Sequence, residues 1–486
     1  MRRPNILIVM TDHQRGDTVL PEHPCRTPNL DRFGKEGVIF TDAYCPSPHC
    51  CPARATFMTG TYPSTHGVWN NIRNPHRLSA GVRPEVPMWS TDLRAAGYDL
   101  VYGGKWHVST TESPADRGWR ELPICAERNA LHGETWDSYA ANARHPRTGG
   151  RAWGEIVRRG WPQYRAFGTM QDENASFDQR VVRQAMEELP KLAARQNPWC
   201  MFAGLIGPHD PYFVPQRHIE RHALSDIPLP ASYGDTMADK PGLYRRARQS
   251  IWGQFSGDEV RDTIRHFWAY CSWLDELFGQ LLECLEATGQ AENTLVLYCS
   301  DHGDYCGEHG LFCKSLPCFK GAYHVPWVMR WPQGIATPGR RVNRFVSLAD
   351  ASPTFLELAG IATDRHSAGS SLVPFLRNEE PAVWRDAVYT QCNGVEIYAN
   401  QRSITTATHK YVHNMFDFDE LYDLRADPHE MVNRINDASL APVLEELSRK
   451  LWQFAMREGD VAPNSYITLA FAPYGPETAF EVPKPD

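Results

Sequence analysis

The sequence predicts an α/β protein built on a mostly parallel β-sheet that is sandwiched by helices. The runs NILIVM (5–10), PWCMFAGLIGPHDPY (198–212) and TLVLYCSDHGD (294–304) each contain a long apolar stretch. Strands that are apolar along their whole length are typical of sheets covered on both faces. Helical segments alternate with these strands, and the strongest is the amphipathic stretch 262–289. This alternation is the pattern of parallel α/β sheets.

The other elements of the first 200 residues follow the same alternation. We expect a helix at 28–37, a strand at 38–45, a helix opening at 54–60, a helix, turn and strand within 90–107, and a helix at 177–196. The irregular stretch 108–175 is too long for a plain connection. It is therefore predicted to be a lid or a substrate-facing insertion.

The pattern of predicted secondary structure changes after about residue 375. AVYTQ, RSITTATHKYVHN and ELYDLRADPHE are typical of short antiparallel strands and turns, and 441–458 is typical of a helix. We therefore expect a catalytic domain over residues 1–375 and a smaller α+β subdomain over 376–486.

Composition excludes several classes of protein. The chain has 486 residues, 42% hydrophobic and 22% charged, with a net charge of −8. This is the profile of an ordinary soluble protein. It lacks the basic stripe of a nucleic-acid-binding protein and any run of transmembrane length. An anionic substrate would have to be attracted by local positive charge.

The N-terminus and the number of cysteines indicate in which cellular compartment the protein is expected. The apolar run at the N-terminus is too short for a signal peptide, because Asp12 interrupts it. We expect a cytoplasmic protein, or a periplasmic or secreted one if a leader has been removed. Thirteen cysteines, an odd number, do not indicate a disulfide framework.

Polar side chains follow the ends of the predicted strands. They are Asp12 and His13, Cys50 to Arg54, Lys105 and His107, His209, and Asp301 and His302, with Lys314 beyond. The carboxyl ends of the strands of an open parallel sheet form a ligand-binding crevice. These groups are therefore predicted to converge, although they are scattered along the chain.

Asp12, His13, Asp301 and His302 form a candidate cation site. Two carboxylates with imidazole partners suit Ca²⁺, Mg²⁺ or Mn²⁺. The alternative is that the aspartates only cap the helices or turns that follow them.

Basic and imidazole side chains add candidates for binding and proton transfer. Arg54, Lys105 and Lys314 are able to counter an anionic substrate, or they are plain surface cations. His107 and His209 suit general acid and base roles near neutral pH, although a single loop histidine is a weak signal.

The adjacent pair Cys50 and Cys51 has several interpretations. Buried thiols pack as small hydrophobic groups, two neighbouring cysteines can form a strained disulfide, and a zinc site would need a second pair at suitable spacing. A thiolate nucleophile at a helix N-terminus beside Arg54 is chemically reasonable. The spacing C-x3-R is, however, too short for the C-x5-R loop of cysteine phosphatases.

Taken together, these motifs resemble the type I sulfatases. CCPAR (50–54), followed by ATFMTG, matches their C-x-P-x-R signature. NILIVMTD, GKWH, GPHDP, SDHGDYCGEHGLFCK and ELYDLRADPHE follow in the family's order. The resemblance covers almost the whole chain. It implies an alkaline-phosphatase-like fold with a C-terminal subdomain, and a sulfuric ester hydrolase.

The resemblance also implies a modified nucleophile. The family converts the first cysteine of the motif, here Cys50, to Cα-formylglycine (3-oxoalanine) with a maturase, and Cys51 falls at a variable position. One hydroxyl of the hydrated aldehyde, activated by a divalent cation, attacks sulfur and displaces the alcohol. Loss of a proton from the second hydroxyl then releases sulfate and re-forms the aldehyde. Ca²⁺ is the family's usual ion, with Mn²⁺ and Mg²⁺ as alternatives.

Site roles carry over residue by residue. Asp12, Asp301 and His302 match metal ligands beside Cys50, while His13 stands where many sulfatases have a second aspartate. Arg54 would hold the formylglycine, Lys105 and Lys314 would bind sulfate oxygens, His107 would be the base and His209 the acid. Asn71 is a candidate substrate contact.

Two alternatives remain beside hydrolysis of a carbohydrate or aryl sulfate. Phosphonate monoester and phosphodiester hydrolases of the same superfamily share the motif, but GKWH favours a sulfatase because they tend to lack its histidine. A non-catalytic binding protein would be expected to have lost Cys50, Arg54 or a metal aspartate. Expected partners are the sulfate ester, the maturase and, as an open question, a second copy of the chain. No nucleic-acid or membrane partner is expected.

Overall fold

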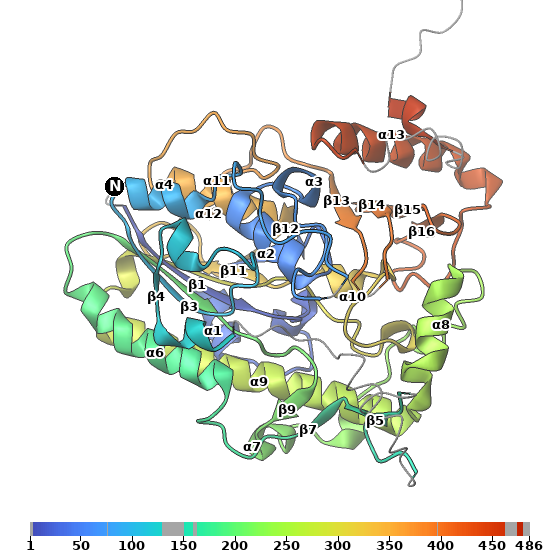
Figure 1. Ribbon diagram of the computed structural model, residues 1–486, viewed down its shortest axis with the longest axis horizontal. Helices are drawn as coiled ribbons and strands as arrows, with labels where there is room; N and C mark the ends of the chain where they lie inside the picture. Colours follow the sequence, from blue (N-terminus) through green and yellow to red (C-terminus); the bar gives the residue numbers. More distant parts are fainter. Residues whose placement is uncertain are drawn as a thin grey trace, which may run out of the picture.

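The computed structural model describes residues 3–74, 76–128, 150–158, 163–395, 397–461 and 474–479. Its centre is an eight-stranded sheet of order β12-β2-β11-β10-β1-β8-β3-β4 (Figure 1). Its strands are β1 (Asn5–Thr11), β2 (Val38–Tyr44), β3 (Asp99–Gly104), β4 (Arg120–Glu121), β8 (Trp199–Gly204), β10 (Thr294–Ser300), β11 (Trp327–Arg330) and β12 (Arg340–Ser347). Only the pairings of β11 are antiparallel. The predicted mostly parallel sheet is confirmed.

Helices cover both faces of the sheet. Alternate residues of β1 divide between the two layers: Ile6 and Ile8 join one core cluster, and Leu7 and Val9 join the other. One layer contains α1 (Pro28–Lys35), α6 (Phe177–Ala193) and α9 (Gly257–Ala287), and the other contains α2 (Cys50–Thr59), α4 (Trp89–Ala95) and α11 (Ala351–Leu358) (Figure 1). Burial on both sides explains why these strands are apolar throughout.

Two helices begin earlier than their sequence patterns predict. In α9 the first residue is Gly257, because Ser256 forms a capping box with Glu259. In α2 the first residue is Cys50 and not Arg54. Proline is tolerated in the first helical turn, where its missing N–H would have no partner, so Pro52 does not delay the start.

The C-terminal part forms the expected α+β unit. Strands β13 (Ala387–Cys392), β14 (Gln401–Thr406), β15 (His409–Asn414) and β16 (Glu420–Asp423) form an antiparallel sheet in that order. Helix α13 (Ala441–Arg457) packs on it (Figure 1) through Leu447 and Trp452, which join the cluster of Tyr389 and Tyr411. The boundary at 375 falls within α12 (Val373–Leu376) and stays a prediction.

Shorter elements connect these layers. They are α3 (Pro63–His66), α7 (Gln216–Ile219), α8 (Gly242–Ser250), α10 (Lys320–Tyr323), β5 (Glu155–Ile156), β6 (Tyr164–Arg165), β7 (Phe167–Thr169) and β9 (Tyr212–Val214). The stretch 108–175 therefore contributes an edge strand, β4, and three short strands, while 129–149 and 159–162 lie outside the described residues. Its predicted role toward substrate stays a prediction.

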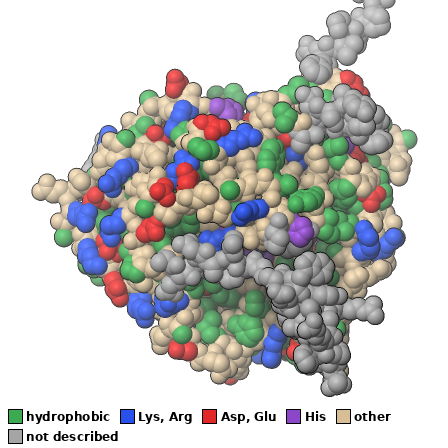
Figure 2. Space-filling view, in the orientation of Figure 1, with side chains coloured by type: hydrophobic (Ala, Val, Ile, Leu, Met, Phe, Trp, Pro, Cys, Tyr) green, Lys and Arg blue, Asp and Glu red, His purple; other side chains and the backbone are tan. Residues whose placement is uncertain are grey.

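The surface shows no single dominant charge on the face in view. Basic and acidic side chains lie interspersed in Figure 2. Among the helices that the structure describes, none is both long and apolar enough to cross a membrane.

Candidate active site

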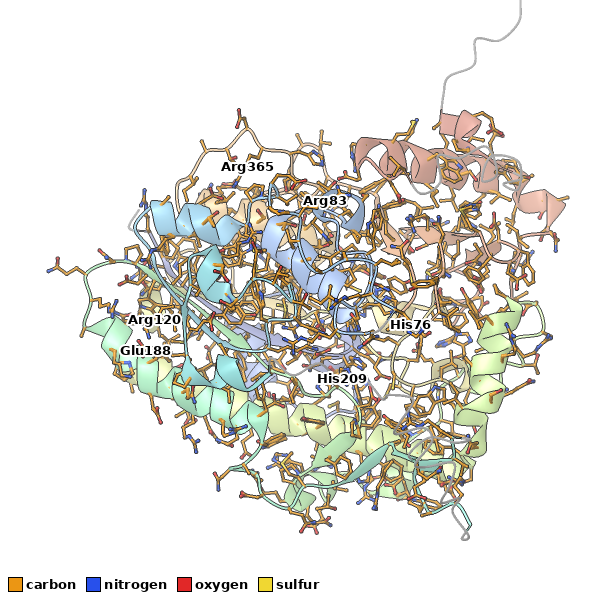
Figure 3. The ribbon with its side chains drawn as sticks, in the orientation of Figure 1. His76, Arg83, Arg120, Glu188, His209 and Arg365 are labelled. Carbon is orange, nitrogen blue, oxygen red and sulfur yellow. The ribbon has the colours of Figure 1, made fainter. Side chains whose placement is uncertain are left out.

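The predicted polar groups come together at the carboxyl edge of the sheet, around a cavity of about 710 Å³. His209, which lines it, lies near the centre of the molecule in Figure 3. The predicted residues that line it are Asp12, His13, Cys50, Asn71, Lys105, His107, His209 and Lys314. Arg54, Asp301 and His302 are buried beside them. Parallel strands place their carboxyl ends on one edge, so residues from all parts of the chain meet there.

Four side chains form a compact group that suits a cation. The ligand atoms of Asp12, Cys50, Asp301 and His302 all lie within 4.8 Å of one another. The Nδ1 atom of His302 is 2.9 Å from the carbonyl oxygen of Gly303. Donation from Nδ1 fixes the tautomer in which Nε2 offers its lone pair to the group. Two carboxylates and an imidazole therefore provide a fitting donor set for a divalent cation.

Arg54 contacts both this group and the residue that follows β3. Its Nε donates to Asp301 Oδ2 at 2.7 Å, and its Nη1 donates to the carbonyl oxygen of Lys105 at 3.1 Å. Burial would raise the pKa of Asp301, but the Arg54 charge holds that pKa well below its usual value. Asp301 therefore remains a carboxylate.

Lys105 enters the cavity directly after β3. Gly104 precedes it with φ +98°, and a Cβ at that position would overlap the carbonyl oxygen of Gly204 in β8. Only glycine permits this close approach, which explains the GGK sequence. The Lys105 ammonium then forms an ion pair with Asp12.

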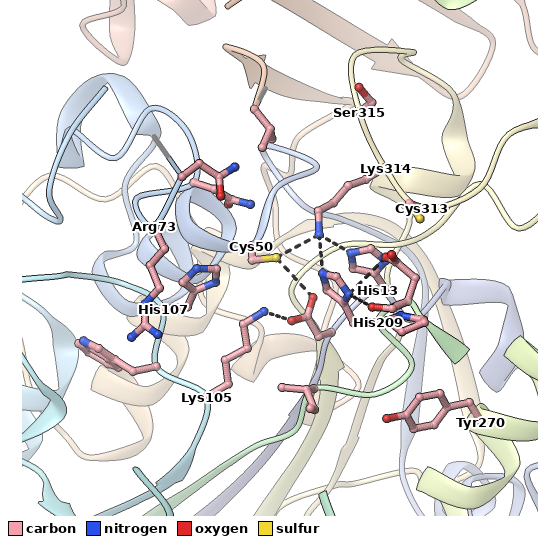
Figure 4. Close-up of a pocket in the computed structure, with 18 residues that line it drawn as sticks. His13, Cys50, Arg73, Lys105, His107, His209, Tyr270, Cys313, Lys314 and Ser315 are labelled. Carbon is pink, nitrogen blue, oxygen red and sulfur yellow. Dashed lines mark hydrogen bonds and ion pairs between the residues drawn. The ribbon is translucent and has the colours of Figure 1, made fainter. Parts of the chain in front are cut away.

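Lys314 lies on the opposite side of Cys50. Its Nζ is 3.1 Å from Cys50 Sγ and 3.4 Å from His209 Nε2, and it also contacts His13 Nε2 (Figure 4). Burial would lower the pKa of Lys314, but the charges of Cys50, Asp210 and Asp301 outweigh this effect and raise it. The amine is therefore a cation beside the candidate nucleophile.

His13 has a different neighbourhood from His302. It groups with Asp12, Cys50 and His209, and not with the set that contains Asp301. Its Nδ1 lies 3.2 Å from Asp304 Oδ2, and its backbone has φ +71°. Uncommon backbone geometry of this kind clusters at functional sites. Ligation of a cation by His13 stays a prediction.

The two candidate proton-transfer groups are both neutral imidazoles. Burial and the Lys105 charge hold the pKa of His107 well below its usual value. Its Nδ1 is buried without a hydrogen-bond partner among the described residues. Burial and the Lys314 charge lower the pKa of His209 to about 3, and its Nδ1 lies 2.6 Å from the carbonyl oxygen of Asp210.

The two adjacent cysteines differ in their surroundings. Cys50 lines the cavity, whereas Cys51 packs behind it and its Sγ accepts a hydrogen bond from Ile72 N at 3.4 Å. Burial raises the pKa of the Cys50 thiol to about 11. An unmodified Cys50 would therefore be a poor nucleophile at neutral pH, which disfavours the thiolate interpretation. Cys50 and Cys51 are free thiols, like every cysteine that the structure describes.

Asn71 lines the cavity and also contacts the backbone of α2. Its Oδ1 accepts a hydrogen bond from the backbone N–H of Cys51 at 3.1 Å, which holds the first turn of α2. Its predicted contact with substrate stays a prediction.

Sequence reasoning missed several residues of the cavity. Arg73, Trp106 and Tyr270 line it. Asp304, whose Oδ2 lies 3.2 Å from His13 Nδ1, contacts a residue of the cavity wall. The clustering of charge in SDHGD could have drawn attention to Asp304. Tyr270 lies within α9, where nothing distinguishes it from a core aromatic residue.

Comparisons with known proteins agree with this geometry. A family model described as "Sulfatase" matches residues 4–361, and one described as "N-sulphoglucosamine sulphohydrolase, C-terminal" matches residues 307–457. The choline-sulfatase of Rhizobium meliloti is 30% identical over 89% of this chain and 82% of its own. The N-acetylglucosamine-6-O-sulfatase of Bacteroides thetaiotaomicron is 25% identical over 97% of this chain and 89% of its own.

A solved structure supports the same fold. The phosphonate monoester hydrolase of Agrobacterium radiobacter superimposes with a TM-score of 0.76 and 26% identity, covering 94% of this chain and 96% of that one.

Proposed function

The chain belongs to the sulfatase family of sulfuric ester hydrolases, and we propose that it releases inorganic sulfate from a sulfated carbohydrate or an aryl sulfate by means of a formylglycine at position 50. The observation that carries this proposal is the place of Cys50. Its sulfur lies at the cavity wall, 3.5 Å from Asp12 Oδ1, 3.3 Å from His302 Nε2 and 3.1 Å from Lys314 Nζ.

Residue 50 would be matured by a formylglycine-generating enzyme. The hydrated aldehyde supplies one hydroxyl for attack on sulfur and a second whose deprotonation releases sulfate. A divalent cation held by Asp12, Asp301 and His302 would lower the pKa of the attacking hydroxyl. Ca²⁺ is the first candidate because the donors are mainly carboxylates, with Mn²⁺ and Mg²⁺ as alternatives.

The lysines provide the charge that an anionic ester needs. Lys105 and Lys314 approach residue 50 from opposite sides (Figure 4), so both ammonium groups can donate to sulfate oxygens. Fixed donors aimed at the oxygens where charge develops stabilise the transition state without reorganisation. Asn71 is a further proposed contact.

We assign the two proton transfers to the imidazoles of His107 and His209. His107, with its unpartnered Nδ1, would take the proton from the second hydroxyl. His209 Nε2 lies 3.4 Å from Lys314 Nζ, and together the two groups would protonate the leaving oxygen. A bound sulfate ester brings negative charge to His209 and would raise its pKa from the value that Lys314 imposes.

One observation favours a second candidate activity. The Agrobacterium radiobacter relative is a phosphonate monoester hydrolase, so we also propose phosphonate monoesters or phosphodiesters as alternative substrates. Lys105 and His107 at the cavity support sulfate esters over these. Cys50, Arg54 and both metal-site aspartates are present, which argues against a purely binding role.

A comparison of rates tests the proposal. The enzyme, co-produced with a maturase, is assayed side by side on an aryl sulfate, a phosphonate monoester and a panel of sulfated saccharides. A higher kcat/KM on sulfate esters supports the sulfatase. A higher kcat/KM on the phosphonate overturns it in favour of the alternative.

A further inference from the structure

We propose that Asp304 is a positioning residue, which holds the Lys314 ammonium against residue 50. It acts through the imidazole of His13 and through the backbone of Cys313. The inference rests on the proposed function, because it explains how a cation assigned to the sulfate oxygens is kept in place. It starts from a fully buried carboxylate that does not line the cavity and has no part in the proposed reaction.

The Asp304 carboxylate is fixed by three hydrogen bonds. Its Oδ2 accepts from the Tyr212 hydroxyl at 2.7 Å. Its Oδ1 accepts from the backbone N–H groups of Cys306 at 2.8 Å and of Cys313 at 2.9 Å. A buried carboxylate with several donors around it has one orientation, because any rotation would leave donors unsatisfied. Asp304 is therefore a rigid anchor for the groups that contact it.

One of these bonds fixes the backbone directly before Lys314. Cys313 has φ +60°, a conformation that residues other than glycine seldom adopt. Its N–H donates to Asp304 Oδ1, and its carbonyl oxygen accepts from Tyr305 N at 3.0 Å. Both ends of the loop 304–314 are thus bound to each other. Contacts of this kind maintain an unfavourable backbone conformation, and here that conformation precedes the residue whose side chain enters the cavity.

His13 provides the second connection between Asp304 and Lys314. Its Nε2 contacts Lys314 Nζ, and its Nδ1 lies 3.2 Å from Asp304 Oδ2. An ammonium has donors and no acceptor, so Nε2 accepts from it and the imidazole proton is on Nδ1. Asp210 Oδ1 is 3.7 Å from the same Nδ1, too far for a hydrogen bond. Asp304 therefore sets the tautomer of His13 and the orientation of its ring.

The place of Lys314 is the one that the proposed chemistry needs. Its Nζ lies 3.1 Å from Cys50 Sγ and 3.4 Å from His209 Nε2 (Figure 4). A lysine side chain is flexible, so its ammonium stabilises developing charge best when other groups hold it in place beforehand. Without Asp304 the ammonium would be free to move, and a displacement of about 1 Å lowers a rate by up to about 100-fold.

A double-mutant cycle tests whether Asp304 acts through Lys314. Asp304→Asn keeps the shape of the side chain but replaces one acceptor oxygen with a donor. The kcat and KM of Asp304→Asn, Lys314→Ala and the double variant are measured on an aryl sulfate after co-production with a maturase. Asp235→Asn is the matched control, because Asp235 Oδ2 lies 2.7 Å from His309 Nδ1 in another buried pair that does not line the cavity.

We expect Asp304→Asn to lower kcat by roughly 10- to 100-fold when Lys314 is present, and by no more than about twofold in Lys314→Ala protein. The KM should change by no more than about threefold, since the loss is in the transition state. Asp235→Asn should lose stability and keep its kcat. An equal loss of kcat with and without Lys314, or an unchanged kcat in Asp304→Asn, overturns the proposal.

A milder variant covers the case in which Asp304→Asn does not fold. Tyr212→Phe removes one hydrogen bond to Asp304 Oδ2 and keeps the aromatic ring. It should lower kcat by about 3- to 10-fold with Lys314 present, and have no further effect in Lys314→Ala protein. The same loss in both backgrounds contradicts the proposal.

Crystal structures keep this inference separate from the proposed function, because they need no turnover. The wild type is compared with Asp304→Asn, or with Tyr212→Phe if that variant alone folds. If the wild type hydrolyses no ester, the proposed function fails, and the structures still decide the role of Asp304. A Lys314 ammonium that has moved away from residue 50 and His13 in the variant supports the inference. An ammonium in its wild-type place contradicts it.

Discussion

Lys314 Nζ lies 3.1 Å from Cys50 Sγ, although the two residues are 264 positions apart in the chain. Lys314 follows β10 and Cys50 follows β2, so their contact depends on the parallel order of the strands that carry them. It places a cation beside the residue that is proposed to become the nucleophile.

The two adjacent cysteines should respond differently to substitution. Cys50→Ala should abolish sulfate release, because no hydroxyl can form at that position. Cys51→Ala should retain most activity and lose about 1 kcal/mol of unfolding free energy, since it removes a buried side chain that accepts one hydrogen bond. Sulfate release and urea unfolding measure the two effects. Equal loss of activity in both variants would contradict the assignment of Cys50.

Lys314→Ala should lower kcat by about 10²- to 10³-fold, because it removes a cation aimed at the oxygens that gain charge. Steady-state kinetics on an aryl sulfate measures the loss. Lys320→Ala serves as a control, because Lys320 is exposed in α10 and does not line the cavity. Unchanged kcat in Lys314→Ala would remove Lys314 from the proposed mechanism.

Arg54→Met should destabilise the fold as well as the site. The substitution leaves the buried carboxylate of Asp301 without its 2.7 Å partner, which costs about 3–5 kcal/mol. Arg402→Met is a matched control, because Arg402 forms a buried ion pair with Asp460 in the C-terminal sheet. Both variants should lose stability in urea, but only Arg54→Met should lose cation affinity. A loss of cation affinity in both would indicate a general effect of unfolding.

Chelation should lower both activity and the unfolding temperature, because a cation that binds only the folded state stabilises it by mass action. Added Ca²⁺, Mn²⁺ or Mg²⁺ should restore them, and the most effective ion identifies the metal. Asp301→Asn should weaken binding measured by calorimetry more than His13→Gln does, since His13 lies in the other group of side chains. Insensitivity to chelation, with no metal in the purified protein, would exclude the cation.

Much of the fold could be predicted, for physical reasons that are visible in particular segments. The runs at 5–10 and 294–304 are apolar because β1 and β10 are covered on both faces, and the polar residues that follow them mark the edge where ligands bind. The positions of Asp12, Lys105 and Asp301 near one another follow from that order alone.

Other features depend on contacts that no local pattern encodes. The ion pair of Lys105 with Asp12 and the contact of Lys314 with His13 arise from the three-dimensional packing of separate loops. The start of α2 at Cys50, before the predicted start at Arg54, was missed because no local pattern shows that Pro52 lies within the first helical turn. Arg73 gave no signal because a single arginine in a loop is normally a surface charge.

Mass spectrometry of the tryptic peptide 36–54 tests whether Cys50 is converted to formylglycine. The peptide contains both Cys50 and Cys51, so fragment ions distinguish them. In protein that hydrolyses sulfate esters, we predict an aldehyde at position 50 and an intact thiol at position 51. Fully active protein with an unmodified cysteine at position 50 would contradict it.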